Sequence, residues 1–323
     1  MSAGSRRSVA FQVLGRPFSA RGVDDDLAAW LARHWDHPHH RLHDHTFSID
    51  LHCSPRPALP SASLDLLPER SASDVDAATP RHSSDDGERA SVLLGSREGG
   101  AQLELRCDGA RVQAWGVHAP GAAGRWPLLL ALHEAVRASG LLPLHCAAAV
   151  HPDEDGASAL LGASGVGKST TLLTLAHAGW APVCEDFAWL DPNTMQLYAW
   201  DHGVHMLPDT LERLGTQAPP TQRAPAGGKH LLTYRDLAEH YGVARRVAAP
   251  LQRLAWLVRD EGPSRWTDLP RVQAVPVLWE AIGLPLTGPA RRQVSAHIAA
   301  LVDAVELRTL RLGRTPVPTT PPG

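Results

Sequence analysis

Residues 162–169 combine glycines, a lysine and a serine in a spacing that suits phosphate groups. In order, the segment reads Gly162, Ala163, Ser164, Gly165, Val166, Gly167, Lys168 and Ser169. It fits the pattern G-x-x-x-x-G-K-[ST] at every position, after an apolar run and before a helical one. Such glycines let backbone N–H groups face phosphate oxygens, while the lysine reaches the β- and γ-phosphates and the serine ligates Mg²⁺. The sequence therefore predicts a loop that binds ATP with Mg²⁺, ending at Thr170.

Two adjacent acids, Glu185 and Asp186, follow this loop after one helix and one strand. A carboxylate at this place can hold the magnesium ion or take a proton from an attacking hydroxyl. The alternative interpretation is that the pair only caps a turn. Neighbouring side chains on an extended segment point to opposite sides, so only one acid faces the phosphates unless the strand ends there.

The elements that must position these residues begin with a hairpin. Apolar runs at 141–150 and 157–161 flank the sequence HPDEDG, which is typical of a hairpin loop. The strand that enters the phosphate loop is then antiparallel to its predecessor, whereas ordinary domains with this loop use parallel βαβ units there. The helix after the loop has Leu172 and Leu175 on one face, and 180–191 is predicted to be the next strand.

The N-terminal part has a different pattern. Strand-prone runs at 8–14 and 46–52 flank a short helix with acids in its first turn. Residues 54–90 are rich in Ser, Pro and Asp and lack a period, which predicts a long flexible loop. Three β-prone runs between 90 and 118 are separated by glycine-containing turns and indicate an antiparallel meander.

These patterns divide the chain into three parts. We expect a smaller α+β domain over 1–125, a nucleotide-binding domain over 126–310 and a disordered tail over 311–323. The second domain begins with a helix over 126–140, and its last helix is predicted over 287–308.

Composition limits the classes of partner. Hydrophobic residues make up 43% of the 323 residues and the formal net charge is −3. Without a concentrated basic surface, neither nucleic acid nor an anionic membrane is expected as the main partner. The four cysteines are scattered, which indicates reduced thiols and no zinc site. No apolar stretch is long enough for a membrane span or a secretory signal, so we expect a cytoplasmic protein.

The hairpin sequence LHCAAAV, the loop sequence LLGASGVGKSTTLLTLAHAGW and the acidic sequence VCEDFAWL together resemble a family. They are similar to the catalytic domain of HPr kinase/phosphorylase, whose phosphate loop is related to that of phosphoenolpyruvate carboxykinase. The similarity is greater to the HPr-kinase-related proteins of peptide-modification gene clusters, which include kinases of lasso-peptide precursors. It covers 140–260 and is firm over 142–191. The implied fold class is α/β, a catalytic domain with a mixed sheet behind a smaller α+β domain.

This resemblance implies a role for each matching residue. His145 matches the active-site histidine, and Glu185 and Asp186 match a pair of aspartates. One acid of such a pair is the base and the other assists the metal; because Glu185 is longer than the family's aspartate, the assignment stays open. We favour Glu185 as the base and Asp186, with Ser169, as the metal partner. The chain departs from the family in two ways: Ala163 stands in place of a frequent acid, and no phosphorylase loop is recognisable after residue 200. The missing loop argues against dephosphorylation and against HPr as the substrate.

The function that these matches imply is a serine kinase that uses ATP and Mg²⁺. Its acceptor would be a peptide or small protein, such as the precursor of a ribosomally made peptide. A kinase of small-molecule hydroxyls and a non-catalytic, nucleotide-dependent sensor or assembly factor are the two alternatives. Assembly of the chain into a homo-oligomer also stays open.

Other polar residues are candidates for supporting roles. Kinases with this loop often add a cation from a later segment, for which Lys229, Arg245 and Arg246 are candidates. The related kinases favour Lys229, which follows two glycines. A histidine-rich stretch over 34–52 has three interpretations: a transition-metal site, a pH-sensitive polar surface or a partner contact.

Overall fold

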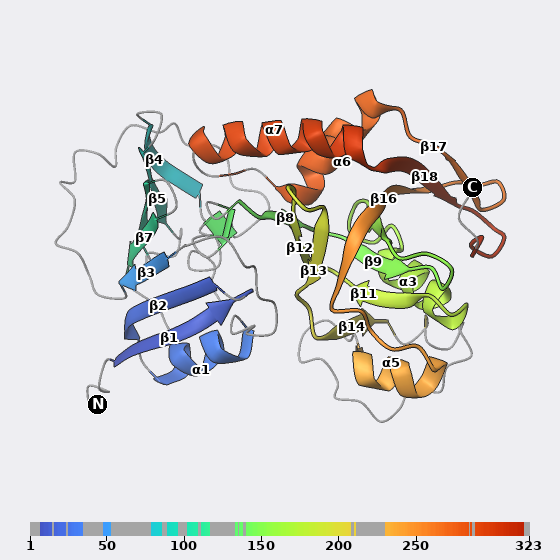
Figure 1. The fold of residues 1–323 in the computed structure, drawn as a ribbon, viewed down its shortest axis with the longest axis horizontal. Helices are drawn as coiled ribbons and strands as arrows, with labels where there is room; N and C mark the ends of the chain where they lie inside the picture. Colours follow the sequence, from blue (N-terminus) through green and yellow to red (C-terminus); the bar gives the residue numbers. More distant parts are fainter. Residues whose placement is uncertain are drawn as a thin grey trace. The chain divides into compact units, whose positions relative to one another are not determined.

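The chain divides into two compact units (Figure 1). The computed structural model describes residues 7–14, 16–23, 25–34, 48–52, 79–85, 89–95, 102–108, 111–116, 133–134, 136–137, 140–207, 210, 230–283, 285 and 288–319. The first unit comprises Met1–Gly140 and Pro285–Val294, and the second comprises Leu141–Leu284 and Ser295–Gly323. The boundary therefore falls after residue 140 instead of the expected 125, and part of a C-terminal helix belongs to the first unit.

The first unit is built on a seven-stranded sheet in the order β1-β2-β3-β7-β6-β5-β4. Its elements are β1 (Arg7–Val13), β2 (Arg16–Val23), α1 (Asp25–His34), β3 (Ser48–His52), β4 (Thr79–Asp85), β5 (Arg89–Gly95), β6 (Gln102–Asp108) and β7 (Arg111–Gly116). The expected meander is confirmed, because β5, β6 and β7 pair antiparallel in sequence order. The flexible loop expected over 54–90 is wrong where β4 lies, since that strand pairs with β5 along its length.

The second unit contains two sheets that share the long strand β16. Its strands are β8 (Leu142–Leu144), β9 (Ala147–Val150), β10 (Ala157–Leu161), β11 (Ala181–Cys184), β12 (Ala188–Asp191), β13 (Gln196–Ala199), β16 (Ala248–Arg259), β17 (Arg265–Asp268) and β18 (Glu306–Leu312). One sheet runs β11-β9-β10-β16-β18-β17, and the other runs β8-β12-β13-β16. A separate pair is formed by β14 (Gly203–Met206) and β15 (His230–Thr233).

The hairpin before the phosphate loop is confirmed. Strand β9 pairs antiparallel with β10, with Val150 opposite Ala157. Strand β10 then pairs parallel with β16, which in turn is parallel to β18. All five residues of β10 are buried, as expected of a strand with a neighbour on each side and a helix over one face.

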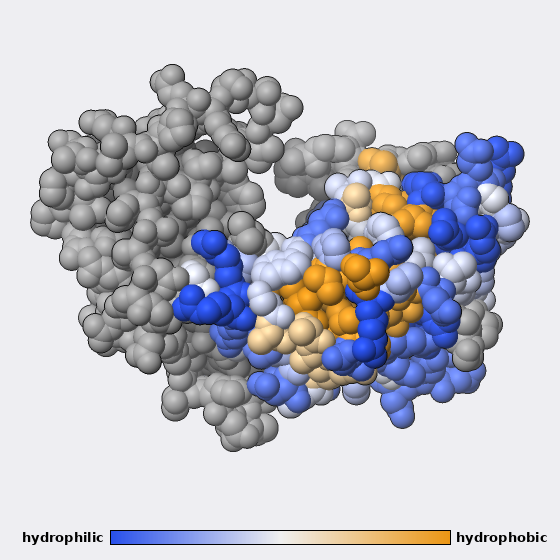
Figure 2. All heavy atoms as spheres, turned by 90° about the horizontal axis from the view of Figure 1, so that it is seen from above, coloured by the Kyte–Doolittle hydropathy of each residue, from blue (hydrophilic) through white to orange (hydrophobic). Residues whose placement is uncertain are grey.

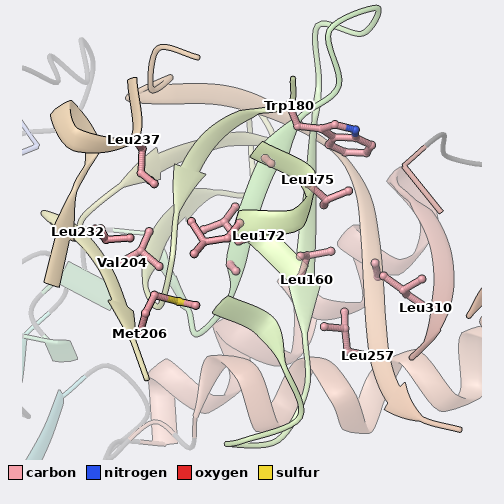
Figure 3. Close-up of a cluster of buried hydrophobic side chains, with 14 of the residues drawn as sticks. Leu160, Leu172, Leu175, Trp180, Val204, Met206, Leu232, Leu237, Leu257 and Leu310 are labelled. Carbon is pink, nitrogen blue, oxygen red and sulfur yellow. The ribbon is translucent and has the colours of Figure 1, made fainter. Parts of the chain in front are cut away.

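The core of this unit lies on both sides of helix α3 (Lys168–His177), which follows the phosphate loop (Figure 3). Leu172 and Leu175 are completely buried, the former near Val204 and Leu232 of the β14–β15 pair. This pair and helix α5 (Tyr234–Tyr241) form a layer outside α3. Helix α3 is therefore enclosed between the sheet and this outer layer, which fixes the residues at its N-terminus.

The C-terminal region differs from expectation. A single helix over 287–308 is wrong: α7 (Gly288–Ala304) ends earlier, and β18 begins at Glu306. A disordered tail from 311 is also wrong, because β18 extends to Leu312 and the next residues are anchored to the domain. The indole N–H groups of Trp180 and Trp266 donate to the carbonyls of Thr319 and Pro318 at 2.8 and 3.3 Å.

Seen from the side on which α6 (Arg271–Ile282) and α7 lie in Figure 1, the described surface is hydrophilic around a hydrophobic patch (Figure 2). On α6, Val272 is 78% exposed and Val275 is 37% exposed. Among the described helices, none combines the length and the apolar character that crossing a membrane requires.

Candidate active site

The loop 162–167 connects β10 to α3, as the sequence predicted. Gly162 and Gly167 have φ values of 147° and 121°, which residues with a side chain rarely adopt. A Cβ atom at Gly162 would also lie 3.0 Å from the carbonyl oxygen of Leu257. The two glycines therefore allow the chain to leave a buried strand, pass close to β16 and enter the helix within a few residues.

Lys168, the first residue of α3, folds back over this loop. Its ammonium group donates to the carbonyl oxygen of Gly162 at 2.7 Å, and only 7% of the residue is exposed. Burial lowers the pKa of Lys168, although the nearby carboxylates of Asp186, Glu185 and Glu280 act in the opposite direction. The lysine thus lies across the loop, the position from which a side chain can contact the phosphates of a nucleotide.

The two acids lie at a crossing between the sheets. We expected one strand over 180–191, but β11 ends at Cys184 in one sheet and β12 begins at Ala188 in the other. Glu185 and Asp186 occupy the connection. Because the strand has ended, the alternation that would separate their side chains no longer applies, and both acids remain close to the loop.

Glu185 faces the loop serine. The Ser169 hydroxyl donates to its Oε1 atom, and its Oε2 atom lies 3.4 Å from Nδ1 of His205. The side chain of Glu185 is only 6% exposed. Burial alone would raise the pKa of Glu185, but the hydrogen bonds from His205 and Ser169 outweigh it, so the pKa lies below its ordinary value. This carboxylate is therefore ionised at neutral pH and fixed in place.

Asp186 has a different environment. Its side chain is 59% exposed, and its Oδ1 atom lies 3.4 Å from Nδ1 of His145, which is itself 44% exposed. The backbone N–H of His145 donates to the carbonyl oxygen of Ala281 in α6 at 2.9 Å. The structure thus brings the histidine of the hairpin to the second acid, at the solvent side of the loop.

A third carboxylate, Asp201, holds the connection that carries the two acids. Its Oδ2 atom accepts the backbone N–H groups of Glu185 and Asp186 at 2.5 and 2.9 Å. Its Oδ1 atom accepts the Tyr234 hydroxyl at 2.6 Å and the Arg245 guanidinium at 3.0 Å. Burial raises the pKa of Asp201, while these four donors act against the rise. The four hydrogen bonds attach the acidic connection to α5 and to the segment before β16.

Arg245 and Arg246, two of the candidate cations, make contacts away from the phosphate loop. Arg245 donates to the carbonyl oxygens of Val183 and Asp201 at 2.9 and 2.7 Å, and its guanidinium lies 3.8 Å from the centre of the Tyr234 ring. Arg246 is exposed and reaches the carbonyl oxygen of Asp155 at 3.3 Å. Arg259, at the end of β16, lies at the loop instead, with its Nη2 atom 3.4 Å from the carbonyl oxygen of Gly165.

Two groups of candidates lie outside the described residues. Lys229 directly precedes β15 and is one of them. In the histidine-rich stretch over 34–52, the structure describes only the backbone of residue 34 and of 48–52. The roles of Lys229 and of the histidine-rich stretch therefore stay predictions. Within the described residues, no group of three or more His, Cys, Asp and Glu side chains could hold a metal ion.

The residues around Ser169 fit the Mg²⁺ ion that the loop implies. Mg²⁺ prefers oxygen ligands and is commonly held by one or two carboxylates together with substrate phosphates. Ser169 and Glu185 present a hydroxyl and an ionised carboxylate in direct contact with each other. The cluster is thus an oxygen-only donor pair of suitable charge, beside the loop that would hold the phosphates.

Sequence reasoning missed three residues of this site. Asp201 and His205 come from the connection after β13 and from β14, and Arg259 comes from the end of β16. None belongs to a motif, because each is brought to the loop by strand pairing that the sequence pattern does not specify. The turn sequence WDHG around Asp201 was a weak signal, since an aspartate in such a turn often accepts backbone N–H groups.

Comparison with known proteins gives little support for a family. No protein-family model matches the chain, and no curated protein matches it either. Among solved structures, the HPr(Ser) kinase/phosphatase from Coxiella burnetii aligns with 53% of this chain and 85% of its own, at 12% identity and a TM-score of 0.28. A likeness this distant carries no functional argument, so the mechanism has to be inferred from the geometry of this chain.

Proposed function

We propose that this protein is an ATP-dependent kinase that phosphorylates a serine hydroxyl of a peptide or small protein. The observation that supports this best is the unequal pair of acids beside the loop. Glu185 is buried against the loop serine, whereas Asp186 is exposed and paired with His145. A protein that only binds nucleotide needs the first carboxylate, but it has no use for a second one that is accessible to an incoming hydroxyl.

In the proposed reaction, Asp186 accepts the proton of the serine hydroxyl. The serine oxygen forms a bond to the γ-phosphorus, the bond from that phosphorus to the β,γ-bridging oxygen breaks, and ADP leaves with the electron pair. His145 orients the Asp186 carboxylate, while Lys168 and Arg259 stabilise the negative charge on the transferring group. Held by Ser169 and Glu185, Mg²⁺ would supply Lewis-acid stabilisation of the phosphate oxygens.

This mechanism exchanges the two roles that we favoured from the sequence. The family resemblance implied one base and one metal partner in this pair, and we favoured Glu185 as the base and Asp186 as the metal partner. We propose the reverse, because Glu185 is the acid that contacts Ser169 and Asp186 is the acid that solvent reaches. The choice of a serine in a peptide rests on the similarity of residues 142–191 to the HPr-kinase-related proteins.

The proposal is tested by transfer of labelled phosphate from [γ-³²P]ATP to a library of serine peptides. We expect label in peptide with the natural chain and a loss of at least about 100-fold with Lys168→Ala, because this lysine is a direct phosphate ligand. The control is Arg314→Ala, an exposed cation near the C-terminus. If no peptide is labelled, the proposed acceptor class is wrong.

The nucleotide part of the proposal has its own measurement. Lys168 and Lys229 are the two lysines of the chain, so an acyl-phosphate derivative of ATP has only these side chains to acylate. We expect Lys168 to be modified, as located by peptide mass spectrometry, and to be protected by excess ATP. Modification without protection would contradict a nucleotide site at the loop. Protected modification of Lys229 would place that residue at the site too, as the sequence predicted.

A further inference from the structure

A pocket of about 230 Å³ opens beside the first half of the phosphate loop. It is lined by His145 and by Ala163 and Ser164 of the loop. The C-terminal half of α6 contributes Val277, Glu280 and Ala281 to the lining. The pocket therefore has an aliphatic wall, one carboxylate and a direct border with the histidine that pairs with Asp186.

Glu280 lies at a position of its helix where a negative charge is unfavourable. Glu280 lies in the last turn of α6, where the helix dipole is negative and a basic residue would be favoured. In the part of the chain that the structure describes, no hydrogen bond or ion pair engages this side chain. The charge of Glu280 acts on Lys168 from a distance, but an exposed acid at a helix C-terminus without a hydrogen bond breaks a local rule, and such exceptions concentrate at functional positions.

A second conflict arises from the reaction itself. A γ-phosphoryl group bound at the loop that lines the pocket would bring negative charge near Glu280, and the ammonium group of Lys168 would be shared between the phosphates and the nearby carboxylates. Like charges at short range in a partly desolvated site repel strongly. The metal does not relieve this conflict, because the residues that suit it, Ser169 and Glu185, do not line the pocket.

Both conflicts are resolved by a cation that arrives with the acceptor. We propose that Glu280 binds an ammonium or guanidinium group of the acceptor, so that the enzyme selects serines with a lysine or arginine close by in the sequence. Val277 and Ala281 contact the methylene stem of that basic side chain. This inference rests on the proposed function and adds to it the charge of the substrate: a basic peptide segment.

The test compares serine peptides that are identical except for arginine or glutamate at each of the two positions on either side of the serine. With the natural chain, we expect kcat/KM to be about tenfold or more higher for arginine than for glutamate at the best position. Glu280→Gln should bring that ratio close to one, and Glu280→Lys should invert it. The matched control is Glu239→Gln, an exposed acid near the C-terminal end of α5 that should keep the ratio unchanged.

Each outcome separates this inference from the proposed function. If the peptides are phosphorylated without a charge preference, or with a preference that the Glu280 variants keep, the inference is overturned and the kinase assignment stands. If Glu280→Gln weakens the binding of a fluorescent ATP analogue, Glu280 serves Lys168 or the metal, and the inference is again overturned. If ATP binds but no peptide is phosphorylated, the proposed acceptor class fails, and the basic substrate fails with it.

Discussion

The two sides of the site are held with very different rigidity. The inner side, which we define as Lys168, Ser169, Glu185 and Asp201, is buried or half-buried, and short hydrogen bonds hold each of its residues in place. The outer side, which we define as His145, Asp186 and Glu280, is exposed, and the 3.4 Å pair of His145 and Asp186 is the one contact between polar side chains that it makes among the described residues. Exposure of the two adjacent acids differs about tenfold, 6% for Glu185 against 59% for Asp186.

The difference indicates that the two acids of one short connection serve separate functions. Preorganised groups suit the part of the substrate that is always the same, here the triphosphate, because they are already oriented when the reaction begins. Exposed groups suit an acceptor that has to approach from solvent and leave again. The peptide unit between Glu185 and Asp186 joins the two functions, and Asp201 fixes this connection by accepting the backbone N–H groups of both residues.

The largest effect is expected on the outer side. Asp186→Asn should lower phosphate transfer by about 10²–10⁴-fold, because an amide cannot accept the serine proton. Nucleotide affinity should change far less than transfer, since Asp186 does not contact Ser169 and acts on Lys168 through its charge alone. Steady-state transfer and titration with a fluorescent ATP analogue measure the two quantities separately. A comparable loss of nucleotide affinity in this variant would contradict the proposed separation of functions between the two sides.

An intermediate effect is expected from the residue that joins the sides. Asp201→Asn should reduce Mg²⁺ affinity about 10–100-fold, because an amide cannot accept from all four donors and the Glu185 carboxylate then shifts. The measurement is ATP-analogue binding in Mg²⁺ and in EDTA, with the melting temperature as a check on folding. Asp153→Asn, at an 89% exposed position of the same unit, is the control. An unchanged difference between Mg²⁺ and EDTA would show that Asp201 has no influence on the inner side.

The smallest effect concerns the stability of the inner side. Glu185→Gln should cost on the order of 1 kcal/mol of unfolding free energy at pH 7, because the charged hydrogen bonds to Ser169 and His205 weaken. The pKa of Glu185 is lowered in the folded chain, so its contribution is full above the unfolded value of about 4.3 and is lost as the pH falls through the folded value. Urea unfolding should therefore show a smaller cost at pH 3 than at pH 7. An equal cost at both pH values would point to packing as its cause.

Sequence reasoning succeeded where the signal is local. The loop 162–169 and the hairpin before it are specified by consecutive residues, and the structure places them as expected. The burial of Leu172 and Leu175 followed from helical spacing in the same way.

Sequence reasoning failed where segments that are far apart in the sequence meet in the fold. The 12-residue β16 pairs with β10, β13 and β18, and no property of its sequence indicates that it belongs to two sheets. The end of β11 at Cys184 was missed because apolar residues stand on both sides of the acids in WAPVCEDFAWLD, which makes the segment resemble a single strand. Arg259 and Glu280 were missed because single charged residues in a strand or helix usually lie on the solvated surface.

The position of β16 has a consequence for how the chain folds. Arg253 of β16 donates to the Ser158 hydroxyl of β10 across 95 positions of sequence, and β18 comes later still. Contacts between segments so far apart form slowly, because a long loop has to close before they stabilise anything. During synthesis, which starts at the N-terminus, the phosphate loop therefore leaves the ribosome long before Arg259 and Leu312, which lie against it, have been made. The nucleotide site is among the last parts of the molecule to be completed.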